Sequence, residues 1–141
     1  MFSGGKDSAY SIFLAKNQGH EIKCLLSLHP KSPESHLLHH PNLAWTSLQS
    51  QSMNIPQLTV TVGSDDTALE ILAIEKILKT AINRYDIEGI LHGGIKSNFQ
   101  RQHFENICNK LQLKSVAPLW ASDPKKYMTD LISSNFDFIF L

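Results

Sequence analysis

The chain has 141 residues, of which 42% are hydrophobic, so it has the length of one domain and enough apolar side chains for a core. Its 13 Lys and Arg balance its 13 Asp and Glu, and this gives no reason to expect DNA or a membrane surface as a partner. The sequence shows no apolar run of membrane-spanning length and no signal-peptide pattern, so we expect a cytoplasmic protein. Cys24 and Cys108 lie outside any Cys-x-x-Cys motif, and we expect reduced, buried thiols.

The first half of the chain alternates helical and extended patterns. Apolar spacing predicts a helix over residues 8–17, with Ser8 as its N-cap, and an apolar run predicts a strand over 22–28. A turn and a histidine-containing loop follow. A helix over 43–53 and a strand over 58–62, in Thr-Val alternation, complete this half.

The second half continues the alternation with longer helices. Thr67–Tyr85 is the longest helical pattern, and a turn with capping residues precedes it. The remaining segments are predicted as strands over 87–91, 116–119 and 138–141 and as helices over 99–111 and 125–134. This alternation predicts a doubly wound parallel sheet with helices on both faces.

Both ends of the sequence look incomplete for such a fold. Met1 and Phe2 alone precede the first glycine pair, where a doubly wound sheet normally places a whole central strand. The far end stops inside the apolar run 136–141. We therefore interpret residues 1–141 as a single domain with a truncated first strand, and we expect a fragment of a longer protein or a misassigned start.

A glycine-rich loop before the first helix carries the main functional signal. Two adjacent glycines let the backbone approach a ligand, and a helix start directs N–H groups and partial positive charge at an anion. A lysine adds charge, and an aspartate beside an anion makes sense when a divalent cation lies between them. The alternative is a plain turn and cap, and the Walker A spacing is not met. We predict a nucleotide phosphate site with magnesium at Ser3, Gly4, Gly5, Lys6, Asp7 and Ser8.

Three stretches carry a family resemblance. Residues 1–10 contain Ser-Gly-Gly-Lys-Asp-Ser, which resembles the pyrophosphate-binding loop of the PP-loop ATP pyrophosphatases. Residues 35–39, the helix behind them and the Asn-Ile-Pro at 54–56 resemble the Ser-x-x-x-His loop, Leu-Gln-rich helix and Gly-Ile-Pro exit of one branch, the diphthine–ammonia ligases. Residues 89–101, followed by Pro-Leu-Trp at 118–120, resemble the third motif of that branch.

The match departs from the family pattern at two positions. Asn98 stands where the family has Asp, and Phe99 stands where it has Tyr, so a contact made there in relatives is weakened here. The family also has a further half with a Gly-Glu-Gly-Gly-Glu-Tyr-Glu-Thr segment, thought to serve diphthine, that this sequence does not contain.

The resemblance implies ATP-dependent amidation of the diphthine carboxylate on elongation factor 2. The nitrogen donor is ammonium, and the products beside the amide are AMP and pyrophosphate. Three alternatives stay open: a nucleotide-binding module without turnover, a tRNA-modifying or sulfur-transfer PP-loop enzyme, and a doubly wound domain whose glycine turn binds nothing. The sequence has no paired cysteines and no excess of basic residues, and this argues against a tRNA-modifying or sulfur-transfer enzyme.

Residues outside the loop are further candidates for the site. Gly93 and Gly94 follow a predicted strand and let the backbone approach the nucleotide, although a plain strand-to-helix turn explains them almost as well. Arg101 and Glu105 are four apart on one helix, which suits an anion-binding arginine positioned by the glutamate. The alternative is a surface ion pair worth about 0.3–0.5 kcal/mol. The candidate substrate or nucleotide contacts are His39, Gln100, Arg101 and Glu105. We do not expect zinc at the histidine loop, because it lacks acidic or cysteine partners.

Overall fold

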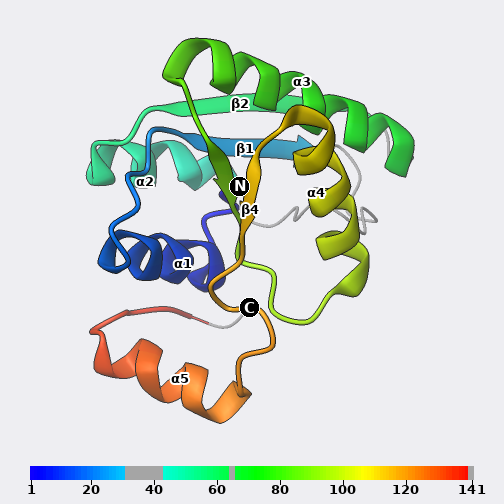
Figure 1. Ribbon diagram of the computed structural model, residues 1–141. Helices are drawn as coiled ribbons and strands as arrows, with labels where there is room; N and C mark the ends of the chain where they lie inside the picture. Colours follow the sequence, from blue (N-terminus) through cyan, green and yellow to red (C-terminus); the bar gives the residue numbers. More distant parts are fainter. Residues whose placement is uncertain (31–42, 64–65, 140–141) are drawn as a thin grey trace.

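The computed structural model describes residues 1–30, 43–63 and 66–139. Helices and strands alternate along the chain, as the sequence predicts (Figure 1). The elements are α1 (Lys6–Asn17), β1 (Leu25–Pro30), η1 (Leu43–Trp45), α2 (Thr46–Met53), β2 (Gln57–Val62), α3 (Thr67–Tyr85), β3 (Gly89–Leu91), α4 (Asn98–Leu111), β4 (Lys114–Val116) and α5 (Pro124–Ser133). The mixed α/β class with parallel strands is therefore confirmed. None of the helices placed in the structure has the length and apolar character needed to cross a membrane.

The strands form two parallel pairs rather than one continuous ladder. β1 pairs with β2, with Leu25 opposite Gln57, and β3 pairs with β4. The first two residues lie between the pairs. The Phe2 N–H donates to the Leu26 carbonyl at 2.8 Å, and the Met1 amino group donates to the Leu91 carbonyl at 2.5 Å. The position of the predicted first strand is thus marked by these two residues, with β1 on one side and β3 on the other.

Hydrophobic clusters cover both faces of the strands. The larger cluster joins β1 and β3 to α3 and α4 and includes Leu26, Ile74, Leu78 and Phe104. A smaller cluster on the opposite face joins Phe2 and Leu25 to α1 and α2. α5 packs on the outer side of α1 (Figure 1). Helices on both faces are what the alternating pattern predicts.

A buried polar chain aligns the first two residues with β1 and α2. The Ser27 hydroxyl, which is fully buried, donates to the Phe2 carbonyl at 2.7 Å. The Gln57 amide donates to the Ser27 hydroxyl and to the Thr46 hydroxyl, both at 2.8 Å. Each of these three hydrogen bonds replaces a bond to water that a polar group loses on burial.

Side-chain caps explain where the long helices begin. Asp66 accepts from the Ala68 N–H at 2.7 Å at the start of α3, and Asp123 accepts from the Lys126 N–H at 2.8 Å at the start of α5. The first turn of α1 is different. Gly5 is its N-cap, and no side chain makes a capping hydrogen bond there. The predicted cap at Ser8 is wrong, because the helix already begins at Lys6.

The strands predicted over 22–28 and 87–91 form as β1 and β3 with shifted ends, and the last two predicted strands depart further. A strand is predicted over 116–119, but β4 ends at Val116. Pro118 has no N–H for a ladder, and the chain turns there, where the Trp120 N–H donates to the Ala117 carbonyl at 3.1 Å. The predicted strand over 138–141 is not formed at 138–139, where Phe138 packs with the α1–α5 cluster instead. Residues 140–141 lie outside the described part of the chain.

The buried Met1 amino group makes stability depend on pH. Burial lowers the pKa of this group to about 6, and the nearby Cys24 and Cys108 oppose this shift to a smaller extent. Between about pH 8 and pH 6 the unfolded chain binds a proton there that the folded chain does not, so stability falls as the pH falls. We expect urea unfolding at pH 6 to show about 2 kcal/mol less stability than at pH 8 from this group. The same chain with an acetylated N-terminus is the control, and an equal loss in both forms would contradict the assignment.

Candidate functional site

The predicted loop leads directly into the first turn of α1. Gly4 has a φ of +78°, in the left-handed region that favours glycine, and Gly5 is extended just before the helix. The Ser3 and Ser8 hydroxyls lie 3.3 Å apart, and Ser8 also donates to the Gly5 carbonyl at 2.9 Å. No side chain makes a capping hydrogen bond at Gly5, and a helix start of this kind directs N–H groups and partial positive charge toward an anion.

Gln49, on α2, contacts the glycine pair. Its amide donates to the Gly4 carbonyl at 3.0 Å. A Cβ at Gly4 would lie 2.6 Å from the Gln49 side-chain oxygen, so the two residues are fitted to each other. The sequence gives this role little signal, since Gln49 is one of two glutamines in the segment that matches the family's Leu-Gln-rich helix.

The two charged loop residues contact each other and α5. Lys6 donates to the Asp7 carboxylate at 2.9 Å. The Tyr127 hydroxyl donates to the same carboxylate oxygen. Tyr127 is buried, and its burial followed by this bond raises its pKa above the usual range. Tyr127 is absent from the sequence-based candidates, because nothing in local spacing relates residues 120 positions apart.

Gly93 brings the end of β3 against the start of α1. A Cβ at Gly93 would lie 2.9 Å from the Asp7 carbonyl carbon and from the Ser8 nitrogen, both backbone atoms. Only a residue without a side chain fits this contact. The structure thus brings Gly93 together with the predicted loop, at the carboxyl end of a parallel strand where doubly wound folds bind ligands.

His92 lies beside this junction and is also absent from the sequence-based candidates. It is 3% exposed, its ring stacks on Phe104 with 4.9 Å between centroids, and its Nδ1 accepts from the Gly94 N–H at 3.3 Å. Burial, and then the positive charge of the Met1 amino group, lowers its pKa to about 4. His92 is therefore neutral at physiological pH. Its Nε2 has no hydrogen-bond partner among residues 1–30, 43–63 and 66–139.

The predicted contacts on α4 form a second cluster. The Arg101 Nε donates to Glu105 at 2.6 Å, and the Arg101 guanidinium lies 4.8 Å from the centre of the Trp120 ring. Ser97 caps this helix by accepting from the Gln100 N–H at 3.3 Å. Both members of the ion pair are nearly half exposed, and Arg101 contacts Glu105 on α4 and the Trp120 ring rather than the glycine loop. The remaining predicted contact, His39, lies outside the described residues.

The loop offers one carboxylate, which suits a metal ion that binds together with a phosphate ligand. Within the described part of the chain, no three His, Cys, Asp or Glu residues gather as a metal site. Asp7 is the acidic side chain of the loop, at the start of α1. Mg²⁺ in nucleotide sites is commonly held by one or two carboxylates, phosphates and water, so the single carboxylate of the predicted loop suits this ion.

Replacing Gly93 tests the backbone contact at the centre of the site. We expect Gly93→Ala to cost about 1–3 kcal/mol of unfolding free energy, because rigid backbone atoms must move to admit the methyl group. Gly63→Ala is the matched control, since a Cβ there meets nothing within 4 Å. Urea unfolding of both variants makes the comparison, and equal stabilities would contradict the packing described.

Removing the Tyr127 hydroxyl tests the link between α5 and the loop. We expect Tyr127→Phe to cost about 1–2 kcal/mol, because a hydrogen bond to a charged group is lost while the ring is kept. Tyr85→Phe, on α3, is the control and should change stability by less than about 0.5 kcal/mol. Thermal or urea unfolding measures both, and matching losses would argue against the Asp7 bond.

Known proteins resemble the chain over most or all of its length. The family described as the diphthamide synthase N-terminal domain matches residues 1–115. The chain is 28% identical to the diphthine–ammonia ligase of Bos taurus over 158 aligned residues, which cover 100% of this chain and 59% of that protein. It is 29% identical to the Homo sapiens ligase, covering 96% of this chain and 57% of that protein, and 28% identical to the Schizosaccharomyces pombe ligase, covering 100% and 26%.

These matches confirm the family predicted from the three motifs. The chain spans 59% or less of the length of these three relatives. The family match includes the glycine loop, Gly93 and the Arg101–Glu105 pair, and it extends over well more than half of the sequence. The chain therefore belongs to the diphthamide synthase N-terminal domain family.

Proposed function

We propose that the chain is the ATP-binding part of a diphthine–ammonia ligase. The observation that supports this most strongly is the contact of Gly93 with the first turn of α1, which sets a glycine loop and a helix N-terminus at the end of a parallel strand. A protein of this family needs such a place for the phosphates of ATP. The names of the relatives supply the reaction class.

In the proposed complex the loop holds the β- and γ-phosphates. The N–H groups at the start of α1 and the two serine hydroxyls donate to phosphate oxygens, and Lys6 offsets the charge that develops as pyrophosphate leaves. Asp7 is the protein's ligand for the Mg²⁺ that accompanies the nucleotide. The Lys6–Asp7 contact already holds both side chains at the loop, and ATP with Mg²⁺ replaces this contact when it binds. The proposed phosphate-binding residues are Ser3, Gly4, Gly5, Lys6, Asp7 and Ser8, with Gly93 and Gly94 behind them.

The proposed reaction has two steps. An oxygen of the diphthine carboxylate on elongation factor 2 attacks the α-phosphorus of ATP, the bond to the bridging oxygen breaks, and pyrophosphate leaves. Ammonia, formed when ammonium loses a proton, then attacks the carbonyl carbon of the acyl adenylate. The carbon–oxygen bond to AMP breaks, the new C–N bond gives the amide, and the nitrogen releases one proton to solvent. Preorganised donors at the phosphates lower the barrier of the first step.

The second cluster is proposed to face the acceptor. Arg101 is held by Glu105 and lies against Trp120, and this fixes a cation on α4 for an anionic group of the acceptor or nucleotide. Gln100 and His39 are proposed to contact the same region. His92 stays neutral and supports Gly94 through its Nδ1, so it adds no positive charge to the site.

A nucleotide-binding module without turnover is the second candidate. The two candidates share the loop and differ in chemistry. If ATP binds and pyrophosphate is released with diphthine-bearing elongation factor 2 and ammonium, the ligase is supported, and binding without release supports the module.

Calorimetric titration with ATP and Mg²⁺ tests the proposed site. We expect the Lys6→Ala, Asp7→Ala double variant to bind at least about tenfold more weakly than the parent, a loss of about 1.4 kcal/mol or more, because a phosphate contact and the metal ligand are removed. Lys16→Ala, near the other end of the same helix, is the control and should bind as the parent does. No binding by a folded parent, or equal binding by the double variant, would overturn the proposal.

A further inference from the structure

Tyr127 joins α5 to the glycine loop across 120 residues of sequence. Its hydroxyl donates to Oδ1 of Asp7, in the first turn of α1. The residue is 6% exposed and belongs to a buried cluster with Tyr10, Leu119 and Leu131. The centroid of its ring lies 5.8 Å from that of the Tyr10 ring. The packing of the ring therefore fixes where the hydroxyl lies.

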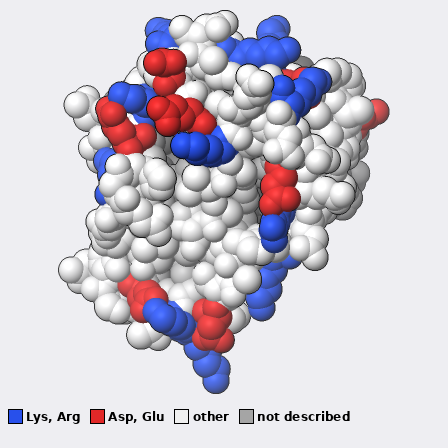
Figure 2. Space-filling view, in the orientation of Figure 1, with Lys and Arg blue, Asp and Glu red and all other residues white. Residues whose placement is uncertain are grey.

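α5 directs its apolar side to α1 and its charged side to solvent. Tyr127 and Leu131 are buried in the cluster that includes residues of α1. Lys126 and Asp130 pair with each other at 2.6 Å, and both side chains are exposed. Figure 2 shows charged side chains gathered over α5, below a broad uncharged area. This amphipathic packing is what brings Tyr127 against α1 and its hydroxyl to Asp7.

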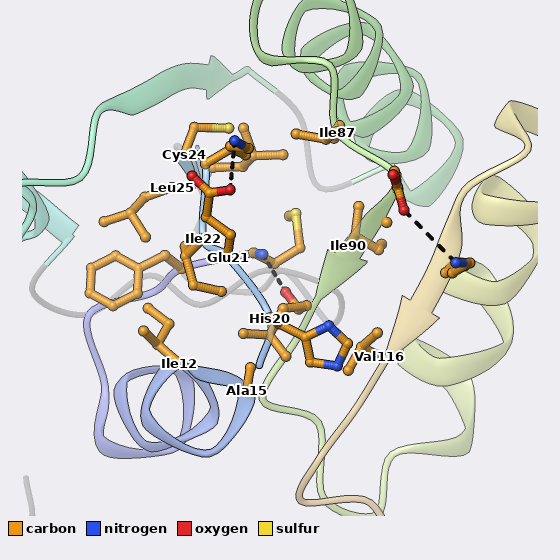
Figure 3. A pocket seen from close by; sticks show the side chains of 18 of the residues that line it. Ile12, Ala15, His20, Glu21, Ile22, Cys24, Leu25, Ile87, Ile90 and Val116 are labelled. Carbon is orange, nitrogen blue, oxygen red and sulfur yellow. Dashed lines mark hydrogen bonds and ion pairs between the residues drawn. The ribbon is translucent and has the colours of Figure 1, made fainter. Parts of the chain in front are cut away.

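The cavity between β1 and β3 is separate from this contact. It has a volume of about 390 Å³, and it is lined by the beginnings of both strands and by residues of α1 such as Ile12 (Figure 3). Tyr10, which packs with Tyr127, is not one of the lining residues, and neither is Tyr127 or Asp7. The contact between Tyr127 and Asp7 therefore belongs to the glycine loop and not to the cavity.

Two donors meet at one oxygen of the Asp7 carboxylate. The Lys6 Nζ donates to Oδ1 at 2.9 Å, and the Tyr127 hydroxyl donates to the same atom. Neither of these two bonds uses Oδ2. The Asp7 side chain is 37% exposed, so the protein holds the carboxylate without enclosing it.

Magnesium makes the orientation of this carboxylate matter. Mg²⁺ requires near-octahedral geometry, with oxygen ligands at about 2.0–2.1 Å. Hydrogen bonds to a ligating side chain set its direction, and their loss weakens metal binding. A carboxylate that is already held at Oδ1 binds the ion through Oδ2 without first losing rotational freedom. A fixed donor at Oδ1 therefore favours binding of the metal at Oδ2.

Lys6 and Tyr127 differ in what they do when a nucleotide binds. In the proposed complex the Lys6 ammonium moves to phosphate, and its flexible four-carbon stem allows this movement. The Tyr127 hydroxyl is on a rigid ring that is packed in the aromatic cluster, so it stays at Oδ1 of Asp7. Tyr127 is then the donor that still orients Asp7 in the loaded site.

We propose that Tyr127 is a positioning residue for the metal ligand of the site. Its hydroxyl holds Oδ1 of Asp7, so that Oδ2 is presented to the Mg²⁺ that accompanies the phosphates. Tyr127 acts through Asp7 and contacts neither the ion nor the nucleotide. The inference rests on the proposed function, because it assumes that the loop binds ATP with magnesium. It adds to the site a residue of α5, far from the loop in sequence.

Calorimetric titration with ATP, in excess Mg²⁺ and separately in EDTA, tests the proposal. We expect Tyr127→Phe to raise the Kd for ATP about tenfold or more in Mg²⁺ and to leave it within about twofold of the parent in EDTA, because the hydroxyl acts through the metal ligand. Tyr10→Phe is the matched control, since it removes a hydroxyl from the same aromatic cluster and keeps the bond to Asp7. It should bind as the parent does in both conditions. Circular dichroism establishes that each variant is folded at the temperature of the titration.

A double-mutant cycle with Asp7→Asn shows whether Tyr127 acts through Asp7. With Asp7→Asn already present, adding Tyr127→Phe should change the Kd for ATP in Mg²⁺ by less than about twofold. A tenfold effect in that background would overturn the inference, as would a parent-like Kd for Tyr127→Phe in Mg²⁺ or equal weakening in Mg²⁺ and in EDTA. In these cases the parent still binds ATP, and Tyr127 is only a structural tie between α5 and α1. A folded parent that binds no ATP in Mg²⁺ would instead overturn the proposed function, and the inference with it.

Discussion

The candidate site depends on one backbone contact, the approach of the β3 end to the first turn of α1. At Gly93 the chain passes so close to Asp7 and Ser8 that no side chain fits between them. This contact sets the glycine loop at the edge where the chain leaves β3, and it brings the N-terminus of α1 against the end of β3. Glycine is needed here for its size, whereas Gly4 is needed for its left-handed φ.

Supports from three distant elements hold the loop in this place. Gln49 binds the Gly4 carbonyl from α2, Tyr127 binds Asp7 from α5, and Gly93 packs from the end of β3. Such outside support keeps the reacting groups in position before a ligand arrives. It also means that the loop is only as well positioned as α5, which reaches the rest of the molecule through the aromatic cluster of Tyr10, Tyr127 and Phe136.

The parts that the sequence predicts well are those set by local chemistry. α3 was predicted with its observed bounds because its apolar spacing is long and Asp66 caps it. The turn at the glycine pair is also predicted, because its residues are contiguous, and Gly4 adopts a left-handed φ; the phosphate site there stays a prediction. β4 was misplaced because an apolar run ending in Pro118-Leu119 resembles a strand until the missing proline N–H is counted. Tyr127 and Gln49 were missed because their contacts with the loop span 120 and 45 residues, and no local pattern reports such distances.

The buried chain of Phe2, Ser27, Gln57 and Thr46 also decides how the elements align as the protein folds. Ser27 is the one hydroxyl residue of β1, between Leu26 and Leu28, so a slip of one residue would place an aliphatic side chain against the Phe2 carbonyl. The Gln57 amide would lose one of its two acceptors as well, and each buried unsatisfied group costs about 1–3 kcal/mol. Ser27 therefore selects the register of the first residues against β1. Among the alignments that apolar packing alone would tolerate, it favours the one that places the glycine loop beside Gly93.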